Sequence, residues 1–297
     1  MPRQTISSQV LRLLAHDRRV VVADWRIHIA YMRVAYASNF VLPDLSKTNK
    51  LIKKFLAAGE IEHIPGLSGI FRITVPYASV LACPDEVILQ ETNPLAVFSS
   101  FTAAQYHNLT YEVPNEIHLT QYKNTSTRLP LGTTPEDWID VPEPKLRSPK
   151  LLHGTTIFWH KAKEEWDFGH TLGHVQGHPI YITDIERTLI DCLRFPERCG
   201  GITETLNIWK RAENILKIDV LISYVEKFRQ TLLRQRVGYL LEQLGETHSK
   251  FNEWAENSVR GSSAKLFANA DFSPTYSARW NLSINAPGAI LSELSEN

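Results

Sequence analysis

Cysteine is scarce in this 297-residue sequence, and the few cysteines follow no pattern. Cys83, Cys192 and Cys199 are too few and too irregularly spaced for the disulfide framework of a secreted protein. We therefore expect the protein in a reducing compartment, the cytosol.

Long hydrophobic runs are also missing. The longest stretch without a charge, 92–111, is interrupted by Asn93, Pro94 and several other polar residues, so it cannot replace water in a bilayer. The first residues lack the apolar segment of a secretion signal. We expect no transmembrane helix and no membrane partner.

A net charge is lacking too, but the balance of 32 basic and 32 acidic residues hides an asymmetry. Residues 1–80 contain 11 Lys and Arg against 5 Asp and Glu, whereas the remainder contains 21 against 27. The length predicts two globular units, because roughly 150 residues is usual for one domain. The basic first unit favours an anionic partner, most commonly nucleic acid, although a solvated basic face explains the charge equally well.

Residues 1–80 contain the patterns of three helices. Apolar residues recur at helical spacing from Ile6 to Leu14 and again from Trp25 to Tyr36, and 20–22 before the second helix also fits a short strand. Ser46 as an N-cap and Gly59 after the end indicate a third helix over 47–58.

The charged residues of the third helix are all lysines. Its apolar face consists of Leu51, Ile52, Phe55 and Leu56. The opposite face consists of Lys47, Asn49, Lys50, Lys53 and Lys54. A helix built for solubility usually mixes signs, whereas a single sign suits contact with phosphates, so DNA binding is favoured over a solvated face.

The segments 61–64 and 70–74 are β-branched and are separated by Pro-Gly and Ser-Gly pairs, which predicts a hairpin. Three helices and a hairpin, with the third helix basic, is the order of a winged helix-turn-helix that binds double-stranded DNA. Asn49 is then the candidate for reading a base edge, the lysines contact phosphates, and His63 and Arg72 belong to the wing. Such a fold can also serve only protein–protein contacts.

Beyond a boundary at 75–84, the mixed pattern predicts an α+β fold, with a winged helix-turn-helix over 1–80 followed by a larger mixed α/β domain over 85–297 whose last part is helical. Five prolines mark 123–150 as a surface loop or extension. The other elements expected are strands at 86–90, 117–120, 155–159 and 181–182, helices at 93–107 and 184–194, and three or four helices between 202 and 259.

Five histidines of the second domain suggest a metal cluster at first sight. They are His153, His160, His170, His174 and His178. A glycine precedes each of the last three and Pro179 follows, which suits a hairpin or loop better than a helix that would align ligands. No cysteine or carboxylate beside them completes a zinc pattern, so we expect no metal.

Three acids, Asp184, Glu186 and Asp191, offer the alternative of a metal-dependent nuclease. Thr183 to Glu186 also fits a capping box, with Thr183 as the N-cap, which explains the acids by helix chemistry. Cys192 and Cys199 are more typical of buried hydrophobes than of nucleophiles, and a phosphate-binding glycine loop is absent. We expect no enzyme activity and no cofactor.

Several segments of the second domain, in order, resemble the AbiEi antitoxin family, the regulator half of type IV toxin–antitoxin systems used in phage defence by abortive infection. The most specific is Glu186-Arg-Thr-Leu-Ile-Asp191 with the Gly200-Gly201 that follows it. The resembling segments are 96–110, 113–119, 183–191, 196–201, 236–245 and 279–285.

The resemblance implies a winged helix that represses its own operon by binding the operator, joined to an antitoxin domain that counteracts a nucleotidyltransferase-like toxin without a stable complex. It implies no enzymatic activity, and it makes Glu186, Arg187 and Asp191 scaffold of the antitoxin domain. A stand-alone transcription factor without a toxin remains an alternative.

The family's antitoxin domain is also associated with positive surface that assists DNA binding. Candidates for such a surface are Lys210, Arg211, Lys227, Arg229, Arg234, Arg236 and Lys250. Acids lie among them, so a mixed surface of salt bridges is the alternative.

Overall fold

The computed structural model describes residues 5–123, 128–258, 264–288 and 291–292. Contacts divide the chain into two compact units. The first consists of Met1–Ala96, Thr125–Ile157 and Leu172–Tyr181, and the second of Val97–Asn124, Phe158–Thr171 and Ile182–Asn297. The domains 1–80 and 85–297 stay a prediction. No helix within the described ranges has the length and apolar character needed to cross a membrane.

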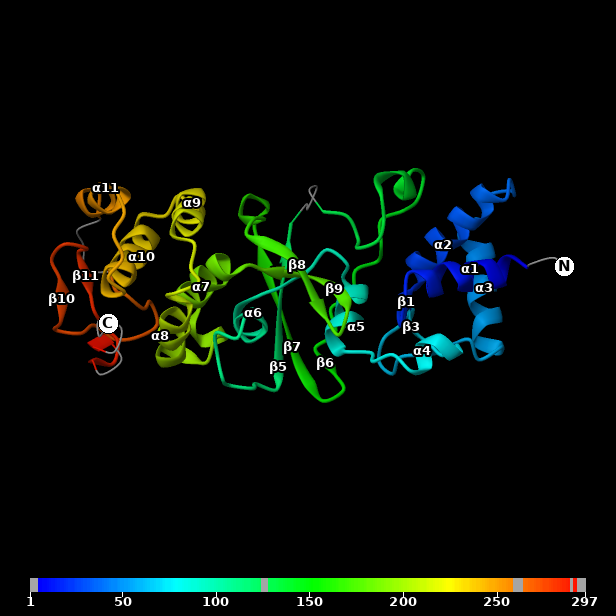
Figure 1. Ribbon diagram of the computed structural model, residues 1–297, viewed down its shortest axis with the longest axis horizontal. Coiled ribbons are helices and arrows are strands. Elements are labelled where there is room, and N and C mark those ends of the chain that lie inside the picture. The colour runs from blue at the N-terminus through cyan, green and yellow to red at the C-terminus, as the bar shows by residue number, and fades with distance from the viewer. Residues whose placement is uncertain (1–4, 124–127, 259–263, 289–290, 293–297) are drawn as a thin grey trace. The chain divides into compact units, whose positions relative to one another are not determined.

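The first unit begins with the three helices and the hairpin that were predicted, and a further strand extends the hairpin to a three-stranded antiparallel sheet (Figure 1). The elements are α1 (Ile6–His16), β1 (Val21–Ala23), α2 (Asp24–Ala37), α3 (Leu45–Ala57), β2 (Ile61–His63) and β3 (Ile70–Ile73). The strand order is β1-β3-β2, with Phe71 opposite both Val22 and His63. The helical patterns, the hairpin and the short strand before the second helix are therefore present.

The remainder of the first unit departs from the predicted pattern at 86–90. This segment belongs to helix α5 (Asp85–Thr92), so the strand expected there is wrong. The run Val87-Ile88-Leu89 is too short for its periodicity to separate strand from helix, and two acids in the first turn suit the positive end of a helix dipole. The other elements are α4 (Pro76–Ser79), η1 (Pro135–Trp138) and β6 (Leu151–Leu152).

The predicted extension at 123–150 is irregular over its described part, with η1 as its helical turn; 124–127 lie outside the described residues. It nevertheless packs against α2. Arg33 donates two hydrogen bonds to Asp137, at 2.7 and 2.6 Å, and the rings of Trp25 and Trp138 lie 5.6 Å apart. The extension is thus a packed segment of the first unit.

A six-stranded mixed sheet has the order β6-β7-β5-β4-β9-β8. Its further strands are β4 (Val97–Phe98), β5 (Glu116–Tyr122), β7 (Thr155–Ala162), β8 (His170–Val175) and β9 (His178–Thr183). The helix expected from Asn93 begins only at Ser100, as α6 (Ser100–Tyr106). Phe98 instead pairs with Leu119 in antiparallel and with Ile182 in parallel, so sheet pairing outweighs the Asn-Pro helix signal.

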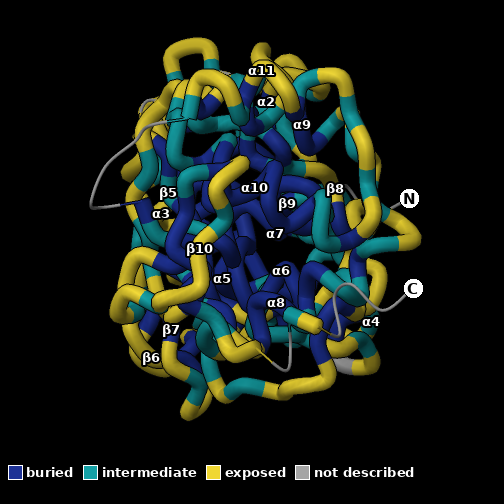
Figure 2. The backbone as a smooth tube through the Cα atoms, turned by 90° about the vertical axis from the view of Figure 1, so that its left-hand side faces the viewer, coloured by how far each residue is buried: buried dark blue, intermediate teal, exposed yellow. Residues whose placement is uncertain are grey.

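The rest of the second unit is mainly helical, as expected, with one two-stranded sheet after the helices. After η2 (Glu164–Trp166) come α7 (Ile185–Arg194), η3 (Pro196–Arg198), α8 (Gly201–Ala212), α9 (Ile218–Phe228), α10 (Thr231–Gln243), α11 (Lys250–Glu256), β10 (Tyr276–Ser277) and β11 (Leu282–Ser283). Four α-helices, α8 to α11, thus lie between 201 and 256, and the predicted limit at 259 is outside the described residues. Figure 2 shows α7 and α10 buried along most of their length, and Trp209, Trp254 and Trp280 are fully buried around them.

Candidate nucleic-acid interface

The helix α3 begins two residues earlier than its sequence signals suggest. Its N-cap is Asp44, whose carboxylate accepts a hydrogen bond from the backbone N–H of Lys47 at 2.7 Å. The N-cap predicted at Ser46 is therefore wrong. Aspartate caps a helix as well as serine does, and its charge also suits the helix dipole.

The two faces of α3 are those predicted from the sequence. Thr48, Leu51, Ile52 and Phe55 are buried. Lys47, Asn49, Lys50, Lys53 and Lys54 are all exposed. Since α3 itself contains no acid, every charge on its exposed face is positive, and Leu45 is exposed there as well.

A buried hydrogen bond fixes α3 to α2. His28 and Thr48 meet through Nδ1 and Oγ1 at 2.7 Å, and the Thr48 hydroxyl donates to the Asp44 carbonyl at 3.2 Å. With the hydroxyl proton so engaged, Nδ1 of His28 is the donor to Thr48. Burial lowers the pKa of His28, so the ring is neutral near pH 7. This hydrogen bond therefore joins α3 to α2.

A groove of about 310 Å³ runs along the cationic face. It is lined by Thr5, Ile6, Ser7, Tyr31, Lys47, Lys50, Leu51 and Lys54. Lys54 Nζ donates to Ser7 Oγ at 2.9 Å, and within the described chain no acid forms an ion pair with these lysines. The groove therefore offers unneutralised ammonium groups to a ligand.

The hairpin β2–β3 contributes less positive charge to the predicted DNA-binding site than α3 does. His63 and Arg72 are both exposed. The ring of His63 lies against Phe71 at 5.1 Å, and Arg72 lies opposite Glu62 in the strand register. Glu62 therefore offsets part of the positive charge that Arg72 would present to a phosphate.

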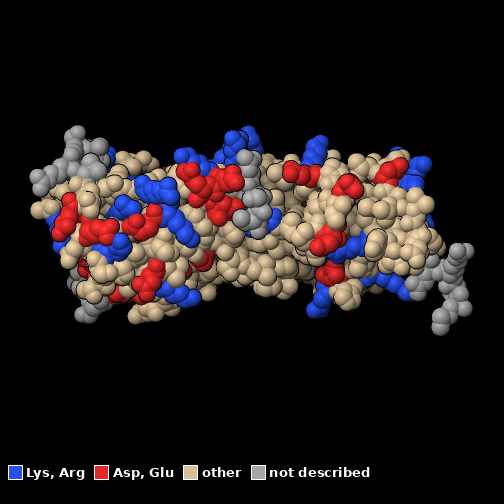
Figure 3. Space-filling view, turned by 90° about the horizontal axis from the view of Figure 1, so that it is seen from above, with Lys and Arg blue, Asp and Glu red and all other residues tan. Residues whose placement is uncertain are grey.

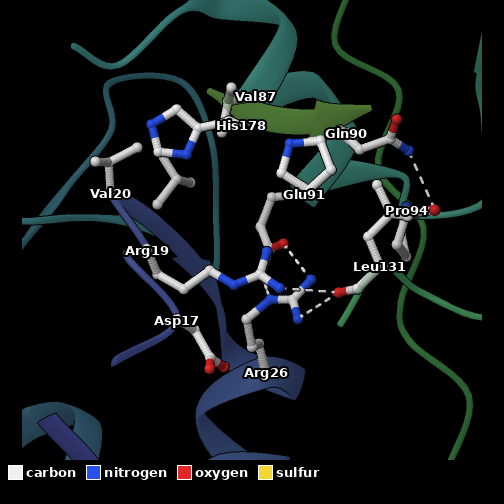
Figure 4. Close-up of a pocket in the computed structure, with 12 residues that line it drawn as sticks. Asp17, Arg19, Val20, Arg26, Val87, Gln90, Glu91, Pro94, Leu131 and His178 are labelled. Atoms are coloured by element: carbon white, nitrogen blue, oxygen red, sulfur yellow. Dashed lines mark hydrogen bonds and ion pairs between the residues drawn. The ribbon is translucent and has the colours of Figure 1, made fainter. Parts of the chain in front are cut away.

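A buried cluster fastens α2 to the rest of the first unit (Figure 4). Arg26 donates to both carboxylate oxygens of Glu91, at 2.6 and 2.7 Å, and to the carbonyl of Leu131 at 2.9 Å. Arg19 donates to the same carbonyl at 3.0 Å, and burial together with the nearby Arg26 lowers its pKa to about 10. Nothing in the sequence pattern indicated this cluster, because its members come from four separate segments.

The five histidines proposed as metal candidates have different partners. His153 contacts Asp85 at 2.6 Å, His160 contacts His118 at 2.9 Å, and His170 contacts Asp167 at 3.2 Å. His170, His174 and His178 lie on the strands β8 and β9, as the hairpin interpretation requires. Across the described residues, no group of three or more His, Cys, Asp or Glu is arranged to hold a metal ion.

Each of the three acids considered for a nuclease site accepts its own hydrogen bonds. Asp184 caps α7 through the N–H of Arg187 and accepts from the Tyr224 hydroxyl at 2.7 Å. Glu186 accepts from the N–H of Lys217 at 2.9 Å, and Asp191 is bound by Arg187.

The predicted capping box is therefore wrong by one residue. Asp184, and not Thr183, is the N-cap, and the Thr183 hydroxyl bonds that of Thr188 at 2.8 Å. The two nearby thiols, Cys192 and Cys199, are buried, and burial raises the pKa of Cys199. The polar groups at the start of α7 thus serve its N-terminus, and the two thiols belong to the buried core.

The basic candidates of the C-terminal helices are interleaved with acids. Figure 3 shows basic side chains in blue and acidic side chains in red together over this part of the chain. Four of them form ion pairs of 2.6–3.2 Å, namely Lys210 with Glu213, Arg211 with Glu204, Arg234 with Glu226, and Lys250 with Glu253. Arg236 is buried and donates to the carbonyl of Lys265. Lys227 and Arg229 are exposed, so acids balance only part of this surface, whereas α3 contains no acid.

No family model and no curated protein matches the chain. Among solved structures, the fold is similar to that of the RV2827C protein from Mycobacterium tuberculosis, with a TM-score of 0.54 and 14% sequence identity. The match covers 99% of this chain and 96% of that chain. At this identity the likeness shows a shared mixed α+β fold alone.

Proposed function

We propose that this protein is a DNA-binding transcriptional autorepressor and the antitoxin of a type IV toxin–antitoxin system, opposing a nucleotidyltransferase-like toxin. The observation that carries the DNA-binding half is the exposed face of α3, where four lysines lie beside Asn49 without an acid. Lysine neutralises phosphates, and an amide can bond adenine in bidentate fashion, so this face combines the two kinds of contact that operator recognition needs.

The order of elements supports a winged helix-turn-helix. The sequence α1-β1-α2-α3-β2-β3, closed by the antiparallel order β1-β3-β2, suits a third helix in the major groove and a β2–β3 wing on the backbone. In that arrangement Lys47, Lys50, Lys53, Lys54 and Arg72 neutralise phosphates, and His63 accompanies Arg72 on the wing.

The antitoxin half of the proposal rests on the resemblance to AbiEi antitoxins. The segments that resemble the family include much of α7 and α10, which are among the most buried helices of the second unit. Two of the segments also meet directly, since Gly238 of α10 lies against the indole of Trp280. The resemblance therefore falls on residues that determine the fold of this unit, as expected of a shared scaffold.

Fluorescence anisotropy of the full chain on its own upstream DNA, against a scrambled duplex and across a salt series, tests the first half. About five phosphate contacts predict a slope of log K against log salt of about −4.5. Equal affinity for both duplexes would reduce the winged helix to a protein-interaction module.

Co-expression with a neighbouring nucleotidyltransferase reading frame tests the second half. Growth rescued by the wild-type chain supports the antitoxin. Operator binding without such a reading frame, or without rescue, identifies a stand-alone transcription factor instead.

A further inference from the structure

The second unit contains a small cavity whose lining is dominated by cations. Its volume is about 60 Å³, several times the roughly 15 Å³ that admits one water. The charged side chains that line it are Lys161, Arg187, Arg194, Arg198 and Asp191. Four cations thus face one carboxylate, and His160, Ser100 and Thr120 add polar groups.

The one carboxylate is already engaged. Arg187, which is 2% exposed, donates from Nε to both oxygens of Asp191 at 3.1 and 3.0 Å. Its Nη1 donates to the carbonyls of Trp166 and Phe168 at 2.8 and 2.9 Å. Arg187 and Asp191 therefore form a neutral pair, and Arg194 and Arg198 have only the longer carboxylate contacts of 3.8 Å.

Arg194 has no carboxylate within hydrogen-bond distance. Its guanidinium lies between the rings of Trp166 and Phe228, at 4.6 and 4.5 Å from their centroids, and its side chain is 11% exposed. The nearest carboxylate oxygen, on Asp191, is 3.8 Å away, beyond hydrogen-bond range. Within the described residues the guanidinium of Arg194 donates no hydrogen bond. A charged fork with five donors is thus largely screened from solvent and lies between aromatic faces.

Arg198 stands nearer to solvent. Its guanidinium stacks on Phe195 at 3.8 Å and its ion contact is with Glu197, also 3.8 Å away and half exposed. Burial, with Arg198 as the next cause, lowers the pKa of His160 to about 4. His160 is therefore neutral near pH 7 and offers hydrogen bonding without further positive charge.

We propose that this cavity binds a tetrahedral oxyanion, either free phosphate or the terminal phosphoryl group of a small phosphate monoester. Arg194 and Arg198 supply the paired donors that match phosphate oxygens. A bound dianion also balances Arg194 and Arg198, whose side chains are 11% and 29% exposed and whose nearest carboxylates are 3.8 Å away. A cavity of this size holds a phosphoryl group but not the sugars on both sides of an internal phosphodiester, so the site is not a part of the duplex-binding face. The proposal stands independently of DNA binding by α3.

Calorimetric titration of the full chain tests the proposal. Inorganic phosphate and ribose 5-phosphate are each added at constant ionic strength, with potassium chloride as the balancing salt. Saturable binding of either anion in the millimolar range or tighter is expected, and the tighter of the two identifies free phosphate or a monoester as the natural form. Absence of saturable binding of both anions to the wild-type chain overturns the proposal.

Two variants and a matched control locate the site. Arg194→Met keeps an unbranched side chain between the two rings, and it should raise Kd at least tenfold. Arg198→Gln changes a more exposed position and should raise Kd by a similar factor. It serves as the test if Arg194→Met does not fold. Lys217→Met removes one exposed positive charge of the same unit outside the cavity and should change Kd less than twofold. Equal losses of affinity in Lys217→Met and the cavity variants would mean attraction by overall charge and would overturn the site.

Discussion

Arg26 of α2 and Glu91 of α5 form a buried, two-pronged ion pair. The two hydrogen bonds measure 2.6 and 2.7 Å, and the side chains are 7% and 5% exposed. Burial alone would raise the pKa of Glu91, but Arg26, Arg19 and the N–H of Ala23 outweigh it and lower the pKa. The carboxylate is therefore ionised in the folded protein, and it connects α5 to the helix on which α3 packs.

Removing one partner of this pair leaves the other charge buried. Glu91→Ala should lower the free energy of unfolding by about 3–5 kcal/mol, because Arg26 then lies in the core without its counter-charge. Urea unfolding followed by circular dichroism measures the loss. Lys163→Ala breaks an exposed pair with Glu165 and should cost less than about 1 kcal/mol. Similar losses of unfolding free energy in both variants would show that the buried pair stabilises the fold no more than an exposed pair does.

Gly238 of α10 is required by the approach of Trp280. A Cβ at this position would overlap the six-membered ring of the indole, which is fully buried and donates from Nε1 to Glu242 at 2.6 Å. Gly238→Ala should therefore destabilise by about 1–3 kcal/mol through overpacking, although alanine is the better helix former. The double variant Gly238→Ala/Trp280→Phe should be less destabilised than the sum of the two single variants. Simple additivity in the double-mutant cycle would contradict the steric explanation.

The sequence predicts α3 well because its information is local. The apolar arc, the lysines and the capping residues all fall within one segment, and the exposed face lies where the helical period puts it. The error at Ser46 reflects two good capping residues within three positions. By contrast, 97–98 becomes a strand through pairing with residues 119–120 and 182, which a local pattern cannot show.

The arginine cavity of the second unit is beyond sequence reasoning for a related reason. Arg187, Arg194 and Arg198 recur at intervals of seven and four, which is a helical signal, but η3 interrupts the helix between the last two. The rings that hold Arg194 come from residues 166 and 228, which only the fold brings together.

The histidine pair of the second unit predicts destabilisation by acid. His118 Nδ1 and His160 Nε2 are 2.9 Å apart, and burial lowers the pKa of both rings, that of His160 to about 4. The unfolded chain therefore takes up protons at these rings below its ordinary histidine pKa of about 6.5, before the folded protein does.

The free energy of unfolding should consequently fall as pH decreases from about 6.5 towards 4. Thermal unfolding across this range measures the slope, and His160→Gln should flatten it relative to wild type. His16→Gln removes an exposed histidine and should leave the slope unchanged. An unaltered slope in His160→Gln would show that the histidine pair does not cause the loss of stability in acid.

On the proposed interface, replacing Asn49 and replacing Lys53 should affect DNA affinity differently, although the two residues are four positions apart on the same exposed face of α3. Asn49→Ala removes a group proposed to read a base edge, so affinity for the operator should fall by about 1–3 kcal/mol while affinity for a scrambled duplex stays the same. Lys53→Ala removes a phosphate contact, so both affinities should fall together and the salt slope should decrease by about 1. Anisotropy on the two duplexes across the salt series separates these outcomes. If Asn49→Ala leaves the discrimination intact, α3 does not read the operator, and the wing or another surface must provide the specificity.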